Sequence, residues 1–349
     1  MGLGTFRRWR RELGRPSPAD RPSPSTPQVR HRARHGGPAA GRVGRALRRL
    51  VGSMLGYEVD SAALIARRKP WHGDPLARRV GRALRELVGS SVAHEVDQAT
   101  LVAQRVQQPI TTGRRIVVTS IRGGAGKTTV SALLGTAFAH YRHDRALIVE
   151  ADPGLGTLPV RVGAPAARFP LGDLARIVAP SMPFEQIAEH LVALPDGCWL
   201  VPVGQTQVDP VVYQSVAMTL NRYFAITVVD CDTMPSELAR TVLAGAHATA
   251  LVAPATAEGV VTTRKMLTWF HPEALARTVI VLTATAPHVA VNLDEAAARL
   301  RVGGASVLTI PYDRHLAAGG KIQASLLAET TRERTTRLAA ELLDRAVRR

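Results

Sequence analysis

Apolar residues follow two patterns along the last two thirds of the chain. Short β-branched or apolar runs predict buried strands, and longer segments with apolar residues three or four apart predict amphipathic helices. The predicted strands are 115–120, 146–150, 198–203, 226–230, 247–252, 277–283 and 306–310. The predicted helices lie near 127–141, 184–193, 208–223, 234–244, 257–270, 291–300 and 331–347. This alternation predicts an α/β domain over 113–349, with a mostly parallel sheet and helices on both faces.

The first 110 residues lack this alternation and carry most of the positive charge. The chain has a net charge of +17, and residues 1–110 hold 21 Lys and Arg against 8 Asp and Glu, hence +13. Residues 1–40 are rich in Arg, Pro and Ser, which predicts a disordered basic tail. Such a tail could bind DNA, an anionic membrane surface or an acidic partner, or simply be solvated. A GC-rich genome is the alternative explanation for the high arginine content of the chain.

Residues 43–68 and 80–105 form an internal repeat, identical at 17 of 26 positions. Each copy predicts a basic amphipathic helix, a break at Gly-Ser and a second helix, so 41–110 should hold two small helical units. Two interpretations stay open. The repeats are a docking element for a protein partner, DNA or a membrane, or they pack on the following domain or on each other.

Composition also bears on location. No apolar run approaches the roughly 18 residues that a membrane-spanning helix needs, and the N-terminus has no apolar core of a secretory signal. The two cysteines, Cys198 and Cys231, suit a reducing compartment. We therefore expect a cytoplasmic protein, with peripheral membrane association through the basic extension as an alternative.

Glycine-rich residues between the first predicted strand and helix have the composition of a phosphate-binding loop. The segment is Gly123-Gly124-Ala125-Gly126-Lys127-Thr128-Thr129. Glycines let successive backbone N–H groups point into one concavity, to which the helix N-terminus adds its positive end. Lys127 can then reach the β- and γ-phosphates of a nucleotide, and the Thr128 hydroxyl can bind Mg²⁺. A plain glycine-rich turn is the alternative.

The loop departs from the common pattern G-x-x-x-x-G-K-[ST], because Ile121 stands at the first glycine. It fits [KR]-G-G-x-G-K-[ST]-[ST] and so resembles the MinD/ParA-like branch of P-loop ATPases. In that family a lysine at the position of Arg122 reaches the partner's phosphates across an ATP-sandwiched dimer. The resemblance therefore implies ATP and Mg²⁺ as ligands and an ATP-dependent homodimer. Arg122 would bring a planar guanidinium to this contact instead of an ammonium group.

Two acidic segments resemble other parts of the family's site. The segment 149–155, Val-Glu-Ala-Asp-Pro-Gly-Leu, is similar to switch I. That similarity implies that Asp152 positions the attacking water and that Glu150 lies near Mg²⁺; two acids that cap a turn are the alternative. The strand ending in Asp230 resembles a Walker B motif, in which the aspartate holds Mg²⁺. The switch II glycine expected next is absent from 231–233, which puts efficient hydrolysis in question.

On the base side, Thr283 stands where the family often has an adenine-reading asparagine, and Pro311 and Asp313 belong to a segment that resembles the base-side loop. The segment 311–319 is also similar to MinD-like ATPases of actinobacterial type VII (ESX) secretion clusters. The resemblance implies that Thr283, Pro311 and Asp313 contact the nucleotide.

Three functions are compatible with these residues. The first is an ATP-hydrolysing switch that dimerises with ATP and Mg²⁺ and serves type VII secretion or intracellular positioning, through a secretion-apparatus or other protein partner bound by the repeats. The second is a ParA-like DNA-segregation ATPase that binds DNA non-specifically through its basic extension. The third is a nucleotide-binding adaptor with little turnover.

Overall fold

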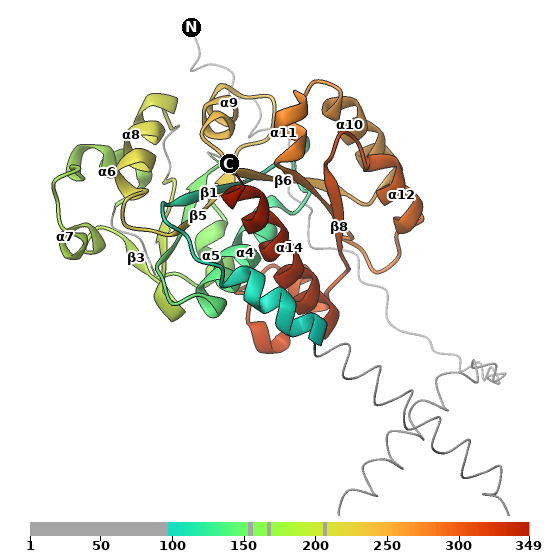
Figure 1. Cartoon of the computed structure of the whole chain (residues 1–349), viewed down its shortest axis with the longest axis horizontal. Helices are drawn as coiled ribbons and strands as arrows, with labels where there is room; N and C mark the ends of the chain where they lie inside the picture. Colours follow the sequence, from blue (N-terminus) through green and yellow to red (C-terminus); the bar gives the residue numbers. More distant parts are fainter. Residues whose placement is uncertain (1–96, 153–155, 166–168, 205–207, 349) are drawn as a thin grey trace, which may run out of the picture. The chain divides into compact units, whose positions relative to one another are not determined.

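The computed structural model describes residues 97–152, 156–165, 169–204 and 208–348, all within the unit Asp74–Arg349. Its centre is an eight-stranded sheet of order β3-β4-β2-β5-β1-β6-β7-β8 (Figure 1). The strands are β1 (Arg114–Ser120), β2 (Ala146–Ala151), β3 (Val192–Ala193), β4 (Cys198–Val201), β5 (Ile226–Cys231), β6 (Ala248–Pro254), β7 (Thr278–Thr283) and β8 (Ser306–Ile310). The predicted tail 1–40, the first repeat and the second repeat up to residue 96 lie outside the described residues.

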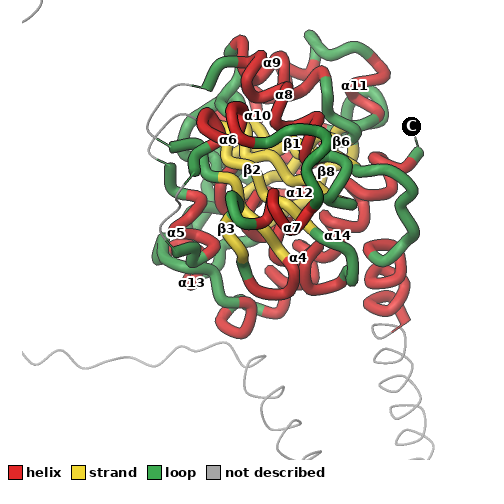
Figure 2. Tube along the Cα trace, turned by 90° about the vertical axis from the view of Figure 1, so that its left-hand side faces the viewer, coloured by secondary structure: helices red, strands yellow, loops and turns green. Residues whose placement is uncertain are grey.

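Helices cover both faces of this sheet, as Figures 1 and 2 show. The labelled α-helices are α4 (Lys127–Tyr141), α5 (Leu158–Val162), α6 (Leu171–Ile177), α7 (Phe184–Ala188), α8 (Pro210–Leu220), α9 (Glu237–Ala244), α10 (Ala257–Leu267), α11 (Pro272–Ala276), α12 (Leu293–Leu300), α13 (Arg314–Ala317) and α14 (Glu329–Val347). One core cluster joins the sheet to α4 and α14, and the other joins it to α6, α8, α9, α10 and α12.

The apolar strand runs are explained by burial on both faces. In β1, Val117 belongs to one core cluster, whereas Ile116 and Val118 belong to the other. Successive side chains of a strand point to opposite faces, so a strand covered on both sides is apolar throughout. Along the sheet order every neighbouring pair from β4 to β8 is parallel, and β3 pairs antiparallel with β4 at one edge. The predicted mostly parallel α/β fold is confirmed, and so are its seven strands.

Several predicted helices differ by two or three residues at an end, such as 208–223, observed as Pro210–Leu220, and 257–270, observed as Ala257–Leu267. The predicted helix 184–193 is wrong at its end, because α7 stops at Ala188 and the chain then turns to form β3 against β4. The predicted helix 234–244 begins only at Glu237, where the Ser236 hydroxyl accepts a hydrogen bond from the Ala239 amide and caps the helix. The short helices α5, α6, α11 and α13 were not predicted, since four to seven residues are too few to show a helical period.

The end of the second repeat packs on the α/β domain. Residues 97–106 form a helix whose Val106 is fully buried in the core cluster of α4 and α14. Arg105 forms an ion pair with Asp344 of α14 at 2.7 Å. The Arg142 guanidinium donates to the Val106 carbonyl oxygen at 2.6 Å. This segment therefore follows the second of the two interpretations, packing on the domain.

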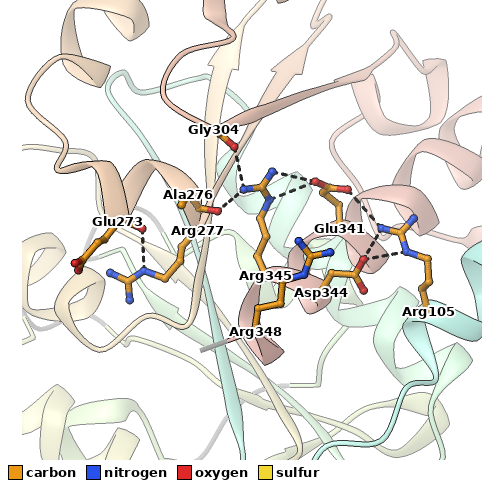
Figure 3. A pocket seen from close by; sticks show the side chains of 9 residues that line it. All are labelled: Arg105, Glu273, Ala276, Arg277, Gly304, Glu341, Asp344, Arg345 and Arg348. Atoms are coloured by element: carbon orange, nitrogen blue, oxygen red, sulfur yellow. Dashed lines mark hydrogen bonds and ion pairs between the residues drawn. The ribbon is translucent and has the colours of Figure 1, made fainter.

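The same ion pair lines a polar pocket of about 690 Å³ between the 97–106 helix, α11 and α14 (Figure 3). Arg345 also lines this pocket. It forms an ion pair with Glu341 at 3.1 Å and donates hydrogen bonds to the carbonyl oxygens of Ala276 and Gly304. Arg277 and Gly304 lie just before β7 and β8 in the chain. The pocket is thus at the amino edge of the sheet, opposite the glycine-rich loop.

Within the described ranges, no helix combines the length and the apolar character needed to cross a membrane.

Candidate nucleotide-binding site

The glycine-rich loop connects β1 to α4 and has the backbone shape that its glycines permit. Gly124 and Gly126 have φ angles of 75° and 94°, in the left-handed region that other residues rarely adopt. Gly126 directly precedes α4, so the first-turn amides of that helix face the loop. A side chain added at Gly123 or Gly124 would meet no atom within 4 Å. The loop therefore has open space next to these two glycines, and a phosphate cradle needs such access.

Lys127 follows β1 and the glycine-rich loop, and its side chain interacts with residues just beyond the ends of β2 and β5. Its side chain is largely buried, and Nζ lies 3.2 Å from Asp152 Oδ2, just beyond β2. The same ammonium donates to the Thr233 hydroxyl beyond β5 at 3.0 Å. Ligands of open α/β sheets bind at the carboxyl ends of the strands, where these residues meet. Thr233 was not predicted; it follows Asp232, whose carboxylate accepts a hydrogen bond from the Thr233 amide at 2.6 Å.

Asp230 at the end of β5 is only 1% exposed. Burial raises its pKa to about 7, although the hydroxyls of Thr128 and Ser131 and the charge of Lys127 lower it. Ser131 Oγ lies 3.0 Å from Asp230 Oδ1, whereas Oδ2 is buried without a hydrogen-bond partner. A buried carboxylate oxygen without a partner is costly, and carboxylates and hydroxyls are the ligands that Mg²⁺ prefers. Asp230 and Thr128 therefore fit a magnesium site.

Glu150, two residues before Asp152, is engaged by the backbone. Its Oε1 accepts from the Leu158 amide at 3.0 Å, and Oε2 accepts from the Val203 amide at 3.1 Å. Burial raises the pKa of this carboxyl, while the two hydrogen bonds lower it. Glu150 thus ties the end of β2 to the start of α5 and to the chain beyond β4. Both oxygens predicted to lie near Mg²⁺ are bonded to these amides.

Replacing Glu150 with glutamine is expected to lower the free energy of unfolding by about 1–3 kcal/mol. The amide side chain keeps one acceptor oxygen, so one of the two backbone N–H donors would face an NH₂ group. Urea unfolding of the variant measures this loss, and Glu189→Gln at an exposed position is the matched control. Unchanged stability together with weaker Mg²⁺-dependent ATP binding would instead place Glu150 at the metal.

A pocket of about 110 Å³ lies beside the phosphate loop and fits the predicted base side. It is lined by Gly126, Thr129, Val130, Leu133, Arg161, Thr283, Ala284, Thr285, Ile310, Pro311, Tyr312, Asp313, Leu316 and Ala317. The structure therefore brings Thr283, Pro311 and Asp313 together next to the glycine-rich loop. This agrees with the order of a nucleotide, in which the base lies at the far end from the γ-phosphate.

The polar groups of two of these residues bind the protein's own backbone. The Thr283 hydroxyl lies 2.7 Å from the Ala125 carbonyl oxygen. Asp313 caps α13 by accepting from the His315 amide at 2.8 Å, and its other oxygen accepts from the Ala328 amide at 2.9 Å. Although desolvation opposes it, these hydrogen bonds lower the pKa of Asp313. Both residues thus shape the pocket wall with polar groups that are bonded to the protein's own backbone.

Arg161 of α5 is a site residue that no motif signalled. It is 8% exposed, and its Nη2 donates to Thr129 Oγ1 at 2.6 Å and to the Leu316 carbonyl oxygen at 3.0 Å. Nη1 donates to the Gly320 carbonyl oxygen at 3.2 Å. Among the described residues no carboxylate forms an ion pair with it, and burial lowers its pKa.

Arg122 lies at the rim of the site. Its guanidinium is half exposed and pairs with Glu258 of α10 at 2.7 Å. Of the residues predicted from the motifs, the structure gathers Lys127, Thr128, Asp152 and Asp230 at the carboxyl ends of β1, β2 and β5, whereas Arg122 lies at the surface.

Known proteins share this architecture. The CobQ/CobB/MinD/ParA nucleotide binding domain (CbiA) matches residues 116–323. The ESX-1 secretion-associated protein EspI of Mycobacterium tuberculosis is 28% identical over 255 residues, which are 69% of this chain and 38% of EspI. The septum site-determining protein MinD of Bacillus subtilis is 33% identical over 123 residues, covering 34% of this chain and 45% of MinD. The aligned region thus spans less than half the length of either relative.

Among solved structures, MinD of Pyrococcus horikoshii in complex with Mg-ADP superimposes with a TM-score of 0.51 at 17% identity, over 66% of this chain and 95% of that one. Similarity at this identity establishes the fold. The resemblance drawn from the motifs is confirmed: the fold is that of MinD and ParA, and EspI agrees with the secretion-associated branch.

Proposed function

The chain belongs to the CobQ/CobB/MinD/ParA family of nucleotide-binding domains, and from this premise we propose that it is an ATP-hydrolysing molecular switch. It binds ATP with Mg²⁺, closes into a homodimer and reopens on hydrolysis. MinD and ParA proteins include ATPases, so membership of the family supports ATP hydrolysis. The arrangement of this chain's residues supports the role proposed for each of them. ATP must bind the closed state more tightly than the open one for such a switch to work.

The observation that carries the proposal is the meeting of Lys127, Asp152 and Asp230 at three adjacent strand ends. Lys127 and the loop amides bind the phosphates, and Asp230 and Thr128 hold Mg²⁺, which when bound neutralises phosphate charge. Asp152, held by the Lys127 ammonium, orients the attacking water. A carboxylate and an ammonium in contact at the phosphate end are suited to these two tasks.

Arg122 is suited to the contact between protomers. Its ion pair with Glu258 joins two exposed side chains, and such pairs contribute about 0–1 kcal/mol. Arg122 can therefore leave Glu258 at little cost and reach the phosphates bound by a partner. Its position at the rim, outside the base pocket and the phosphate cradle, supports this role.

The similarity to EspI supports a role in type VII secretion, with the N-terminal repeats as the element that binds the apparatus. Intracellular positioning is the other role that the family supports. DNA binding by the basic extension stays a prediction from charge alone; it requires retention on DNA that weakens steeply with salt.

A second candidate function is a nucleotide-binding adaptor with little turnover. Its support is the chain after β5, where Asp232 and Thr233 stand in place of the expected glycine and Thr233 holds the Lys127 ammonium. An additional carboxylate near the phosphates, and a lysine engaged by a hydroxyl, both work against rapid hydrolysis.

Light scattering and phosphate release, measured together on the full chain, separate these candidates. The switch predicts a mass near 37.4 kDa without nucleotide or with ADP, and twice that mass with ATP and Mg²⁺, accompanied by phosphate release. ATP binding with neither dimer nor phosphate would establish the adaptor. Absence of ATP binding would refute both.

A further inference from the structure

Arg161 brings a buried positive charge to a part of the site that Lys127 does not reach. Its partners are one hydroxyl and two carbonyl oxygens, which accept hydrogen bonds but carry no net charge. A buried cation is costly unless an anion accompanies it. Since none of the described carboxylates pairs with Arg161, an anionic ligand would complete its surroundings.

The position of Arg161 identifies which anion fits. Thr129, its closest partner, lies in the first turn of α4, a 15-residue helix with no acidic residue in that turn. The positive end of this helix and the guanidinium therefore converge. Thr129 follows Lys127 by two residues in the phosphate loop, and Arg161 itself lines the base pocket together with Thr129. The phosphoryl group between a base and its terminal phosphates is the α-phosphate.

The backbone holds Arg161 in this place. The Ile322 amide donates to the Arg161 carbonyl oxygen at 2.8 Å, so α5 is bonded to the segment that follows α13. Its side-chain bonds reach Leu316 of α13 and Gly320 of the segment that follows it. Arg161 thus links the phosphate loop to the base-side loop through a side chain with few rotamers open to it, and a ligand would find the guanidinium already oriented.

We propose that Arg161 is a nucleotide-binding residue whose guanidinium binds the α-phosphate of a nucleoside di- or triphosphate. The proposal deepens the proposed function and rests on nucleotide binding at this site. It assigns the γ-phosphate end to Lys127 and the α-phosphate to a separate cation on α5. Affinity for ADP then depends on Arg161 as well as on the glycine-rich loop.

Calorimetric titration with Mg²⁺ and ADP, and with each diastereomer of ADP carrying sulfur on the α-phosphate, tests this contact. The wild type is expected to prefer one diastereomer, because sulfur in place of the contacted oxygen weakens the hydrogen bond. Arg161→Gln is expected to bind ADP about 10- to 100-fold more weakly, as for the loss of a charge-assisted hydrogen bond. The variant should also lose most of the preference between diastereomers.

Two further variants separate binding from folding. Arg161→Lys keeps the charge without the planar fork, and is expected to retain the fold and part of the affinity with a reduced preference. Arg142→Gln is the matched control, because Arg142 is equally buried but lies at the far end of α4, with Asp144 as partner. This control should leave both ADP affinity and the preference unchanged.

Three results would overturn the proposal while leaving the proposed function intact. They are a wild type that binds ADP without preference, an Arg161→Gln variant with unchanged affinity, and a weaker variant that keeps the full preference. The last would assign Arg161 a purely structural role. A wild type that binds no ADP or ATP at all would refute the proposed function together with this inference.

Discussion

Replacing Lys127 with alanine is expected to abolish measurable ATP hydrolysis and to weaken ATP binding. The largely buried Lys127 ammonium follows the glycine-rich loop directly and pairs with Asp152 at 3.2 Å. Removing one donor aimed at the charge that develops in a transition state costs about 10²- to 10³-fold in rate. Loss of a charge-assisted hydrogen bond to phosphate should weaken affinity by about 10- to 100-fold. Phosphate release and titration with ATP and Mg²⁺ measure the two effects.

Lys265→Ala is the control for this experiment, because Lys265 is an exposed lysine of α10. It should bind and hydrolyse ATP like the wild type. If Lys127→Ala instead retained wild-type affinity and turnover, the loop between β1 and α4 would not be the phosphate site, and the proposed function would fail. The variant's thermal unfolding should be recorded as well, since Lys127 also bonds to Thr233.

The sequence predicts the strands of this protein well, because the apolar pattern of each strand lies within a few consecutive residues. Each of β1, β2 and β5 is covered on both faces, so the middle of each strand is a run of apolar residues that the sequence shows directly. The glycines of the phosphate loop are equally readable, since only glycine accepts their left-handed backbone without strain. Strands and the loop together fix where the site must be, at the carboxyl ends of the parallel strands.

What could not be predicted depends on contacts between residues distant in sequence. Glu150 and Asp152 are two positions apart and look alike, yet Asp152 meets Lys127 while Glu150 bonds to an amide 53 positions away. The Arg161 side chain meets a carbonyl oxygen 155 positions later, at Leu316, and nothing in its own neighbourhood marks it. Thr283 is predicted to contact the nucleotide, and only the structure shows that its hydroxyl meets the Ala125 carbonyl oxygen. Only the fold decides these partners.

Replacing Asp152 with asparagine is expected to separate ATP binding from hydrolysis. The carboxylate lies next to the Lys127 ammonium but outside the glycine cradle, so its loss should spare the groups that bind phosphate. Positioned acid–base groups contribute about 10²- to 10⁴-fold to rate, and phosphate release should fall by that amount. ATP should still bind, because the Lys127 ammonium is then free of a competing negative charge.

The consequence for the switch is a dimer that forms and does not reopen. With hydrolysis slowed, light scattering of Asp152→Asn with ATP and Mg²⁺ should show the doubled mass for far longer than in the wild type. Asp196→Asn, at an exposed turn residue with φ 57°, is the control, since asparagine tolerates that left-handed backbone. A variant that hydrolyses ATP normally would remove Asp152 from the reaction. One that binds ATP but stays monomeric would remove dimerisation from the proposed function, because stable ATP occupancy is the condition under which closure must occur.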